Sequence, residues 1–202
     1  MWPEEAIYIS WAIWAASWMI AAFWSNRTVR RPGGGREWPY RVLELGGFVL
    51  LLVPFRNRTA IDYYRGATAH SVFAQRFWIL SPDVSWVMAG LAVVGFLFCW
   101  WARLHLGRLW SGAITRKEGH HVVATGPYAI VRHPIYTGIL LASAATAMVE
   151  GTGFAVAAFV LLLAGYWMKA RLEERFLRAE LGAEAYDAYA RKTAMLIPFV
   201  RV

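Results

Sequence analysis

The sequence predicts an all-α, polytopic integral membrane protein with about five transmembrane helices and a cytosolic C-terminal helix. Hydrophobic residues make up 58% of the 202 residues and charged residues only 17%, whereas globular proteins average about 25% charged residues. The chain holds 12 tryptophans, and indole rings favour the headgroup level of a bilayer. Its apolar runs are separated by polar segments and approach the length that a membrane-spanning helix needs.

Five apolar segments are the predicted spans: residues 6–24, 42–55, 84–101, 135–149 and 154–168. The first is about long enough to cross a bilayer. The second is short and carries Glu44 near its start. That carboxylate is either a functional group or a side chain that reaches the interface. A tight turn at 150–153 makes a hairpin of the last two spans.

Small residues mark the fourth predicted span: Ala142, Ser143, Ala145 and Ala147. Small side chains let helices in a membrane approach closely. The same residues could instead form one wall of a gap through which a lipophilic molecule enters from the bilayer. Both interpretations stay open from the sequence.

The segments between the spans are polar. Residues 25–41 form a loop with five arginines, and residues 56–82 are mixed enough for a loop with an interfacial helix. Ser81 or Asp83 is the expected N-cap of the third span. Residues 169–192 have a helical pattern and form the predicted C-terminal helix.

The distribution of basic residues predicts the orientation. With five spans, 17 of the 21 lysines and arginines fall on one side of the membrane, and basic loops face the cytosol. The N-terminus is therefore predicted outside and the C-terminus inside. The formal charge of +8 is explained by this topology and by anionic headgroups, so no nucleic-acid partner is predicted.

We expect two parts: residues 1–101 with three spans, and residues 102–202 with the remaining spans and the chemistry. A polar, turn-rich stretch at 125–138 runs directly into the fourth span. Pro134 disfavours helix at the preceding residue and suits the first turn of a new one. Arg132 and His133 are thus predicted where a loop becomes a helix, beside free backbone N–H groups that favour an anion. An interfacial anchor of tyrosine and arginine is the alternative.

This stretch reads GPYxxxRHPxYxG from Gly126 to Gly138. It resembles the signature of the isoprenylcysteine carboxyl methyltransferase family, which is similar to the membrane phospholipid methyltransferases. The resemblance covers about the C-terminal half, from Ala102 onward. Further matching positions are the segment 102–111, His120, Glu173-Glu174, the segment 181–186, Tyr189 and Ile197-Pro198.

The resemblance implies S-adenosyl-L-methionine bound between the last three spans at the cytosolic side. One wall of the implied site comprises His120, Tyr128, Arg132, His133, Tyr136 and Gly138; the other comprises Glu173 and Glu174. Adjacent helix residues point about 100° apart, so at most one of the two glutamates should face a given pocket. The alternative for the pair is a solvated helix start with salt bridges to Arg171 or Arg175.

The implied reaction is carboxyl O-methylation of an isoprenylcysteine-like, lipophilic acceptor. A carboxylate is already ionised and needs no general base, whereas the amine of a phospholipid, the alternative acceptor, needs one. Arg191, next to Lys192, is a candidate to orient the acceptor, and Glu174 is the second candidate catalytic residue. The predicted partners are the lipophilic acceptor and the bilayer; if the source is bacterial, the predicted location is the plasma or inner membrane. The oligomeric state stays open.

Two other classes of protein remain. A transporter would usually carry charge near mid-membrane, and the third to fifth spans carry none there. A haem or metal protein could use the histidines at 105, 120, 121 and 133, but adjacent histidines ligate poorly from one helix and no metal-ligand spacing supports them. No metal is therefore predicted. The lone Cys99 excludes a disulfide framework.

Overall fold

The computed structural model of the protein describes residues 1–33, 35–52 and 72–200. Six α-helices lie in these residues, which agrees with the predicted helical class. They are α1 (Pro3–Ala22), α2 (Trp38–Leu52), α4 (Pro82–Leu106), α5 (Pro134–Glu150), α6 (Gly153–Leu181) and α7 (Ala183–Ala190). The short elements are strands β1 (Thr28–Arg30) and β2 (Arg116–Lys117) and the 3-10 turns η1 (Val72–Ala74), η2 (Gly107–Leu109) and η3 (Gly126–Ala129).

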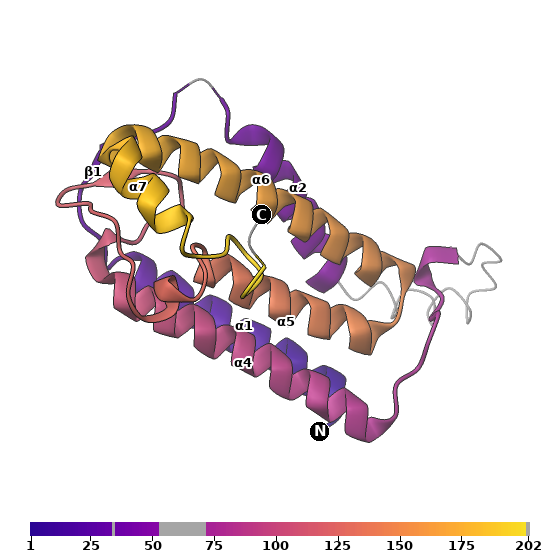
Figure 1. The fold of residues 1–202 in the computed structure, drawn as a ribbon. Helices are drawn as coiled ribbons and strands as arrows, with labels where there is room; N and C mark the ends of the chain where they lie inside the picture. The colour runs from indigo at the N-terminus through magenta and orange to yellow at the C-terminus, as the bar shows by residue number, and fades with distance from the viewer. Residues whose placement is uncertain (34, 53–71, 201–202) are drawn as a thin grey trace.

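The long helices alternate in direction along the chain. α1 and α4 run parallel, because the ring of Trp18 meets that of Trp100 while Trp11 meets Phe96 one to two turns earlier on both helices. α5 then runs back between α4 and α6, and α2 lies along α6 (Figure 1). All five helices thus share two common ends.

Three helices are long and apolar enough to cross a membrane: α1, α4 with the η2 turn that follows it, and α6. With 17 residues, α5 reaches about 26 Å at 1.5 Å per residue, against about 30 Å of hydrocarbon, and the 15 residues of α2 within the described part of the chain reach about 23 Å. The model therefore supports an integral membrane protein, while the count of five spans stays a prediction.

Several predicted boundaries change. The fifth span and the first part of the polar segment after it, residues 169–181, form one continuous helix, α6, whose C-cap is Gly182 with φ +99°; residues 183–190 form the separate helix α7. Backbone helix geometry does not stop at the membrane surface, so apolar length alone placed the boundary too early. Ser81, not Asp83, caps α4 by accepting from the N–H of Val84 at 3.4 Å. Most of the predicted interfacial segment at 56–82 lies outside the described residues.

Two glycines set the packing of α5 on α4. A Cβ at Gly138 would lie 2.4 Å from the carbonyl oxygen of Gly95 and 2.6 Å from Cys99 Sγ, so only hydrogen fits at this contact. Ser143 and Ala147 on α5 are buried, at 0% and 6% exposure. Close packing is therefore the correct interpretation of the small residues, and they line no gap toward the bilayer.

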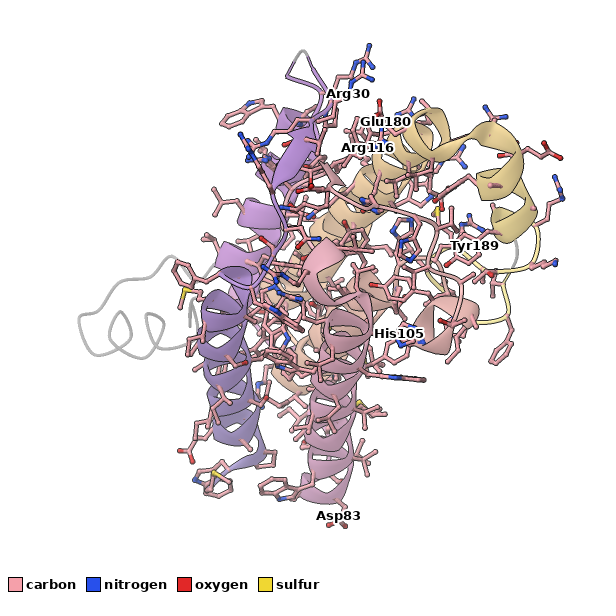
Figure 2. All side chains as sticks on the ribbon, turned by 90° about the vertical axis from the view of Figure 1, so that its left-hand side faces the viewer. Arg30, Asp83, His105, Arg116, Glu180 and Tyr189 are labelled. Atoms are coloured by element: carbon pink, nitrogen blue, oxygen red, sulfur yellow. The ribbon has the colours of Figure 1, made fainter. Side chains whose placement is uncertain are left out.

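The basic segments meet at one end of the helices. β1 pairs with β2, and Glu180 of α6 binds Arg30 at 2.9 Å and Arg116 at 3.4 Å. Figure 2 places these three side chains at the end opposite Asp83. The fully buried Arg103 closes the same end by donating to the carbonyls of Ala21 and Trp24.

Candidate active site

The motif folds as a 3-10 turn followed by the start of α5. Gly126 has φ +58°, a conformation that favours glycine, and a Cβ there would lie 2.7 Å from the ring of His105, which would have to move. Pro134 opens α5, with His133 as its N-cap. The predicted change from loop to helix at Arg132 and His133 is confirmed.

The C-terminal segment after α7, around residues 193–196, forms backbone hydrogen bonds with the motif. Val131 bridges to Ala194 in parallel. The N–H of Arg132 donates to the Ala194 carbonyl at 2.8 Å, and the N–H of His133 to the Met195 carbonyl at 3.2 Å. The chain's own carbonyls thus satisfy the N–H groups of Arg132 and His133, and an anion at the N–H groups of the first turn of α5 stays a prediction.

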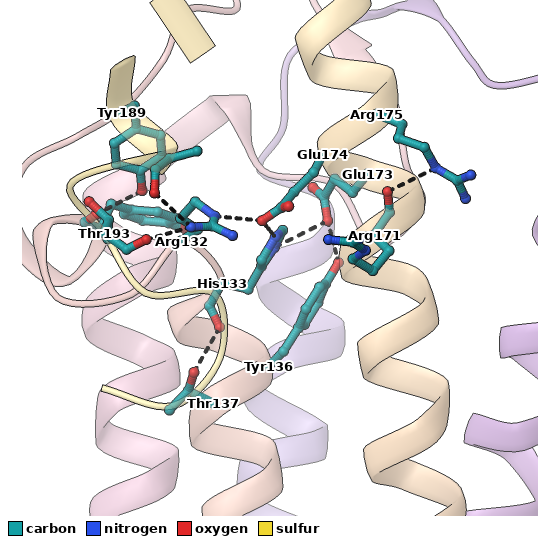
Figure 3. Close-up of polar contacts among 12 residues, drawn as sticks. Arg132, His133, Tyr136, Thr137, Arg171, Glu173, Glu174, Arg175, Tyr189 and Thr193 are labelled. Carbon is teal, nitrogen blue, oxygen red and sulfur yellow. Dashed lines mark hydrogen bonds and ion pairs between the residues drawn. The ribbon is translucent and has the colours of Figure 1, made fainter. Parts of the chain in front are cut away.

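Glu174 joins two residues of the motif. One carboxylate oxygen accepts from Arg132 Nε at 2.6 Å and lies 3.2 Å from His133 Nε2 (Figure 3). Arg132 Nη1 donates to the carbonyls of Ala190, at 3.0 Å, and Thr193. Only Arg132 Nη2 has no partner among the described residues. Glu174 and Arg132 thus bind α6, the motif and the C-terminal segment together.

Glu173 takes a different direction. It accepts from the hydroxyl of Tyr136 at 2.7 Å, and it lies 3.7 Å from His133 Nδ1. The ring of Tyr136 stacks on that of His133, with centroids 5.2 Å apart and planes 2° from parallel. The two glutamates therefore diverge as helix geometry predicts, and neither follows the alternative of pairing with Arg171 or Arg175.

These groups surround a hollow of mixed polar and apolar lining whose void is about 790 Å³, counting the space at its open mouth. Six of the predicted site residues line it: His120, Tyr128, Arg132, His133, Tyr136 and Glu173. Tyr186 and Tyr189, from the matching region downstream, also line it. Leu106 and Trp110 supply apolar wall. The hollow thus combines aromatic faces, one carboxylate and several N–H donors.

Three predicted residues lie elsewhere. Gly138 faces α4, in the glycine contact described above. Glu174 lies behind Arg132 and borders a second hollow on another face of α6. Arg191 caps the end of α7 with an exposed side chain and lines neither hollow. The sequence motif identifies the neighbourhood of these residues but not the direction in which each side chain points.

The hydrogen bonds of His120 fix its tautomer. Its Nδ1 accepts from the N–H of Lys117 at 3.3 Å, so a neutral ring carries its proton on Nε2. Burial lowers the pKa of His120 below its ordinary value, which favours that neutral ring. Burial also raises the pKa of Tyr128 and of Tyr189, so both phenols remain protonated. His120 is thus an uncharged side chain in the wall of the hollow.

Lys169 is a residue that the sequence interpretation missed. It lies one turn before Glu173 and is 9% exposed. Its Nζ is 3.4 Å from Glu44 Oε1 and 5.1 Å from the ring centre of Tyr136, while Tyr40 and Tyr166 complete an aromatic surround. Glu44 therefore pairs across helices instead of reaching to the interface. A lone basic residue at the start of the polar part of α6 was the available signal.

This fold and this hollow define an integral membrane protein with a polar pocket at one end of its helices. The profile of the isoprenylcysteine carboxyl methyltransferase family matches residues 87–178 of this chain. The resemblance inferred from the motif is thereby confirmed. The matched region includes most of α4, the motif and the paired glutamates, but not the C-terminal segment.

Named relatives fall into two groups. The chain is 33% identical over 149 residues to the cobalt-zinc-cadmium resistance protein CzcN of Cupriavidus metallidurans, covering 71% of this chain and 66% of that protein. It is 32% identical over 121 residues to the nickel-cobalt-cadmium resistance protein NccN of Alcaligenes xylosoxydans xylosoxydans, covering 57% and 54%. It is 30% identical over 120 residues to a probable protein-S-isoprenylcysteine O-methyltransferase of Oryza sativa subsp. indica, covering 58% and 62%. The chain thus spans between about half and two thirds of each of these relatives.

Proposed function

We propose that this protein is a membrane-embedded, S-adenosyl-L-methionine-dependent methyltransferase that methylates the carboxylate of an isoprenylcysteine-like acceptor. The observation that carries the proposal is the hollow itself. Side chains from the 110–123 loop, the motif, α6 and α7 line one polar space at the end of an apolar bundle. The family whose profile matches residues 87–178 uses this cofactor as its methyl donor.

The donors and acceptors around the hollow fit such a cofactor. Glu173 can accept from ribose hydroxyls or from the ammonium group. Arg132 Nη2 and the Nε2–H of His120 can donate to the carboxylate, and the rings of Tyr128, Tyr186 and Tyr189 offer surface to the adenine. When bound, the cofactor supplies an electrophilic methyl group on its sulfonium.

Within this proposal Glu174 is a positioning residue. It contacts Arg132 and His133 but does not line the hollow, so it acts by holding those two side chains in place. Arg191, the other candidate catalytic residue, is exposed and does not line the hollow, although Tyr189 two residues before it does. We assign it no contact with the cofactor.

A carboxylate acceptor suits the lining better than an amine. An amine must lose a proton, and buried His120, whose Nδ1 is already engaged, is a poor base because its pKa is lowered. N-methylation of a phospholipid is therefore the second candidate. Among residues 1–33, 35–52 and 72–200, no three histidine, cysteine or acidic side chains gather as metal ligands. We accordingly do not extend the metal-resistance names of two relatives to direct metal binding here.

We further propose that the hollow faces the cytosol and that the chain crosses the membrane five times. The basic segments 28–30 and 116–117 and the end of α6 share the end at which the hollow lies, and basic segments favour the cytosolic side. Residues 102–202 then form the methyltransferase core, and residues 1–101 supply the supporting helices.

The test uses detergent-purified protein in two steps. First, a calorimetric titration measures S-adenosyl-L-methionine binding in wild type and in His133→Ala. Second, transfer of a radiolabelled methyl group is measured to farnesylcysteine, to its carboxamide, which has the same tail without the acid, and to phosphatidylethanolamine. Labelling of the acid alone supports the proposal. Labelling of the phospholipid alone would show that the acceptor is a phospholipid amine instead of a carboxylate. Lack of cofactor binding would show that the protein is not a methyltransferase of this kind.

A further inference from the structure

A second hollow lies along the outer face of α6, about half a turn of the helix away from Glu173. Its void, counting the open mouth, is about 1360 Å³. Four arginines line it: Arg36, which precedes α2, and Arg171, Arg175 and Arg178 of α6. Arg36 and Arg175 also border the neighbouring hollow beneath the 32–36 loop. We call the first of these two hollows, the one lined by all four arginines, the arginine groove.

Most of the positive charge in the arginine groove is uncompensated. Arg178 forms a two-pronged pair with Asp187, at 2.8 Å for both contacts, and Glu174 is engaged by Arg132. Within the described parts of the chain, Arg36, Arg171 and Arg175 have no carboxylate partner. Three exposed guanidinium groups from two separate chain segments therefore converge on one space with a net positive charge.

The depth of the groove matches that of lipid headgroups. Trp167 on α6 is 51% exposed, and Trp38 at the start of α2 is 71% exposed. The pairing of Glu44 with Lys169 sets the register of the two helices, which places Trp38 near the level of Arg171. Exposed indoles favour the headgroup level. Arg171 follows Trp167 by one turn, or about 6 Å toward the polar end of the helix.

We propose that the arginine groove binds the phosphate-bearing headgroup of an anionic phospholipid from the surrounding bilayer. A phosphodiester offers paired acceptor oxygens to the planar fork of a guanidinium, and Arg171 and Arg175 lie four residues apart on one helix face. The cytosolic leaflet carries anionic lipid. The acyl chains would lie along the apolar part of α6 below Trp167, while the exposed ring of Trp167 packs beside the headgroup. This inference does not depend on methyl transfer.

The experiment measures binding of tail-labelled phosphatidylglycerol and phosphatidylcholine to the full chain in neutral detergent micelles. The test variant is Arg171→Gln/Arg175→Gln. The matched control is Arg27→Gln/Arg31→Gln, which removes the same charge from exposed positions of the basic loop that do not line the groove. The test variant should lose about tenfold in affinity for phosphatidylglycerol, the scale for losing charge-assisted contacts. The control should change little, and phosphatidylcholine should bind weakly throughout.

Three outcomes would overturn the proposal. Equal losses in both variants would mean that net charge, not the groove, attracts the lipid. Equal binding of both lipids to the wild type would remove headgroup selectivity. Displacement of the lipid by excess inorganic phosphate would indicate a site for free phosphate. Arg171→Lys/Arg175→Lys keeps the charge without the fork and should retain part of the affinity, and unchanged elution and helix content show that each variant is folded.

Discussion

Lys169 of α6 and Glu44 of α2 form an ion pair across two helices, with Nζ 3.4 Å from Oε1, beneath the ring of Tyr136. Both side chains are largely buried, at 11% and 15% exposure. The pair lies one turn below Glu173, which the Tyr136 hydroxyl contacts. Lys169 therefore lies directly under Tyr136, one of the side chains that line the proposed cofactor pocket.

Removing one member of this pair should destabilise the protein. Lys169→Met leaves the Glu44 carboxylate without its cation, and a broken buried pair costs about 3 kcal/mol. The double variant Lys169→Met/Glu44→Leu should recover much of that loss, since no buried charge then lacks a partner. Denaturant unfolding of all four proteins in detergent gives the coupling energy. A coupling near zero would show that the two side chains act independently.

The two glutamates should separate into two phenotypes. Glu173→Gln should weaken binding of S-adenosyl-L-methionine and leave unfolding almost unchanged, because Glu173 faces the hollow. Glu174→Gln should lower both, by about 1–3 kcal/mol in stability, because Arg132 and His133 lose the negative charge of their shared partner. Calorimetric titration and thermal unfolding measure the two quantities. Identical effects of the two variants would contradict the assigned directions.

Truncation of the C-terminal segment should disrupt the motif. A chain that ends at Lys192 lacks the carbonyls of Ala194, Met195 and Leu196, which accept from the backbone of Arg132, the backbone of His133 and the hydroxyl of Thr137. We expect loss of cofactor binding and a lower unfolding temperature. The control chain ends at Pro198 and keeps all three contacts. If both truncated chains bind the cofactor like the wild type, the segment is dispensable for the pocket.

The membrane orientation is tested with reporter fusions after Arg31 and after Val202 in a bacterial host. Because most basic residues fall on one side of a five-span chain, both fusions should report a cytosolic position. A fusion after Gly151, in the turn between α5 and α6, should report the opposite side. An external signal from either of the first two fusions would place the hollow on the wrong side for the proposed acceptor.

Local chemistry made much of the fold predictable. Pro134 located the start of α5, Ser81 was one of two expected caps, and helix geometry separated Glu173 from Glu174 before their partners were known. What the sequence did not reveal depends on residues distant in the chain. The lysine that pairs with Glu44 is 125 positions away, and the carbonyls that satisfy the motif come from a segment with no pattern of its own.

The boundary predicted at the end of the fifth span was placed too early for a different reason. Hydropathy reports where a helix leaves the bilayer, whereas the backbone continues until a residue breaks its geometry. Gly182 is that residue. Gly138 shows a related limit: a glycine in the signature permits close approach of either a backbone or a cofactor, and only the structure shows that its neighbour is the backbone of α4.

The contact between Gly95 and Gly138 has a consequence for the chemistry at the end of α5. The backbones of α4 and α5 are in direct contact at these two glycines. No side chain lies between them that could change its rotamer and so compensate for a movement of one helix against the other. A methyl group at position 138 would push α5 away from α4. Because His133 lies little more than one helical turn away, its side chain would be displaced as well. Gly138 thus sets the distance between α4 and α5, and through it the position of His133 in the pocket, although Gly138 itself does not line that pocket.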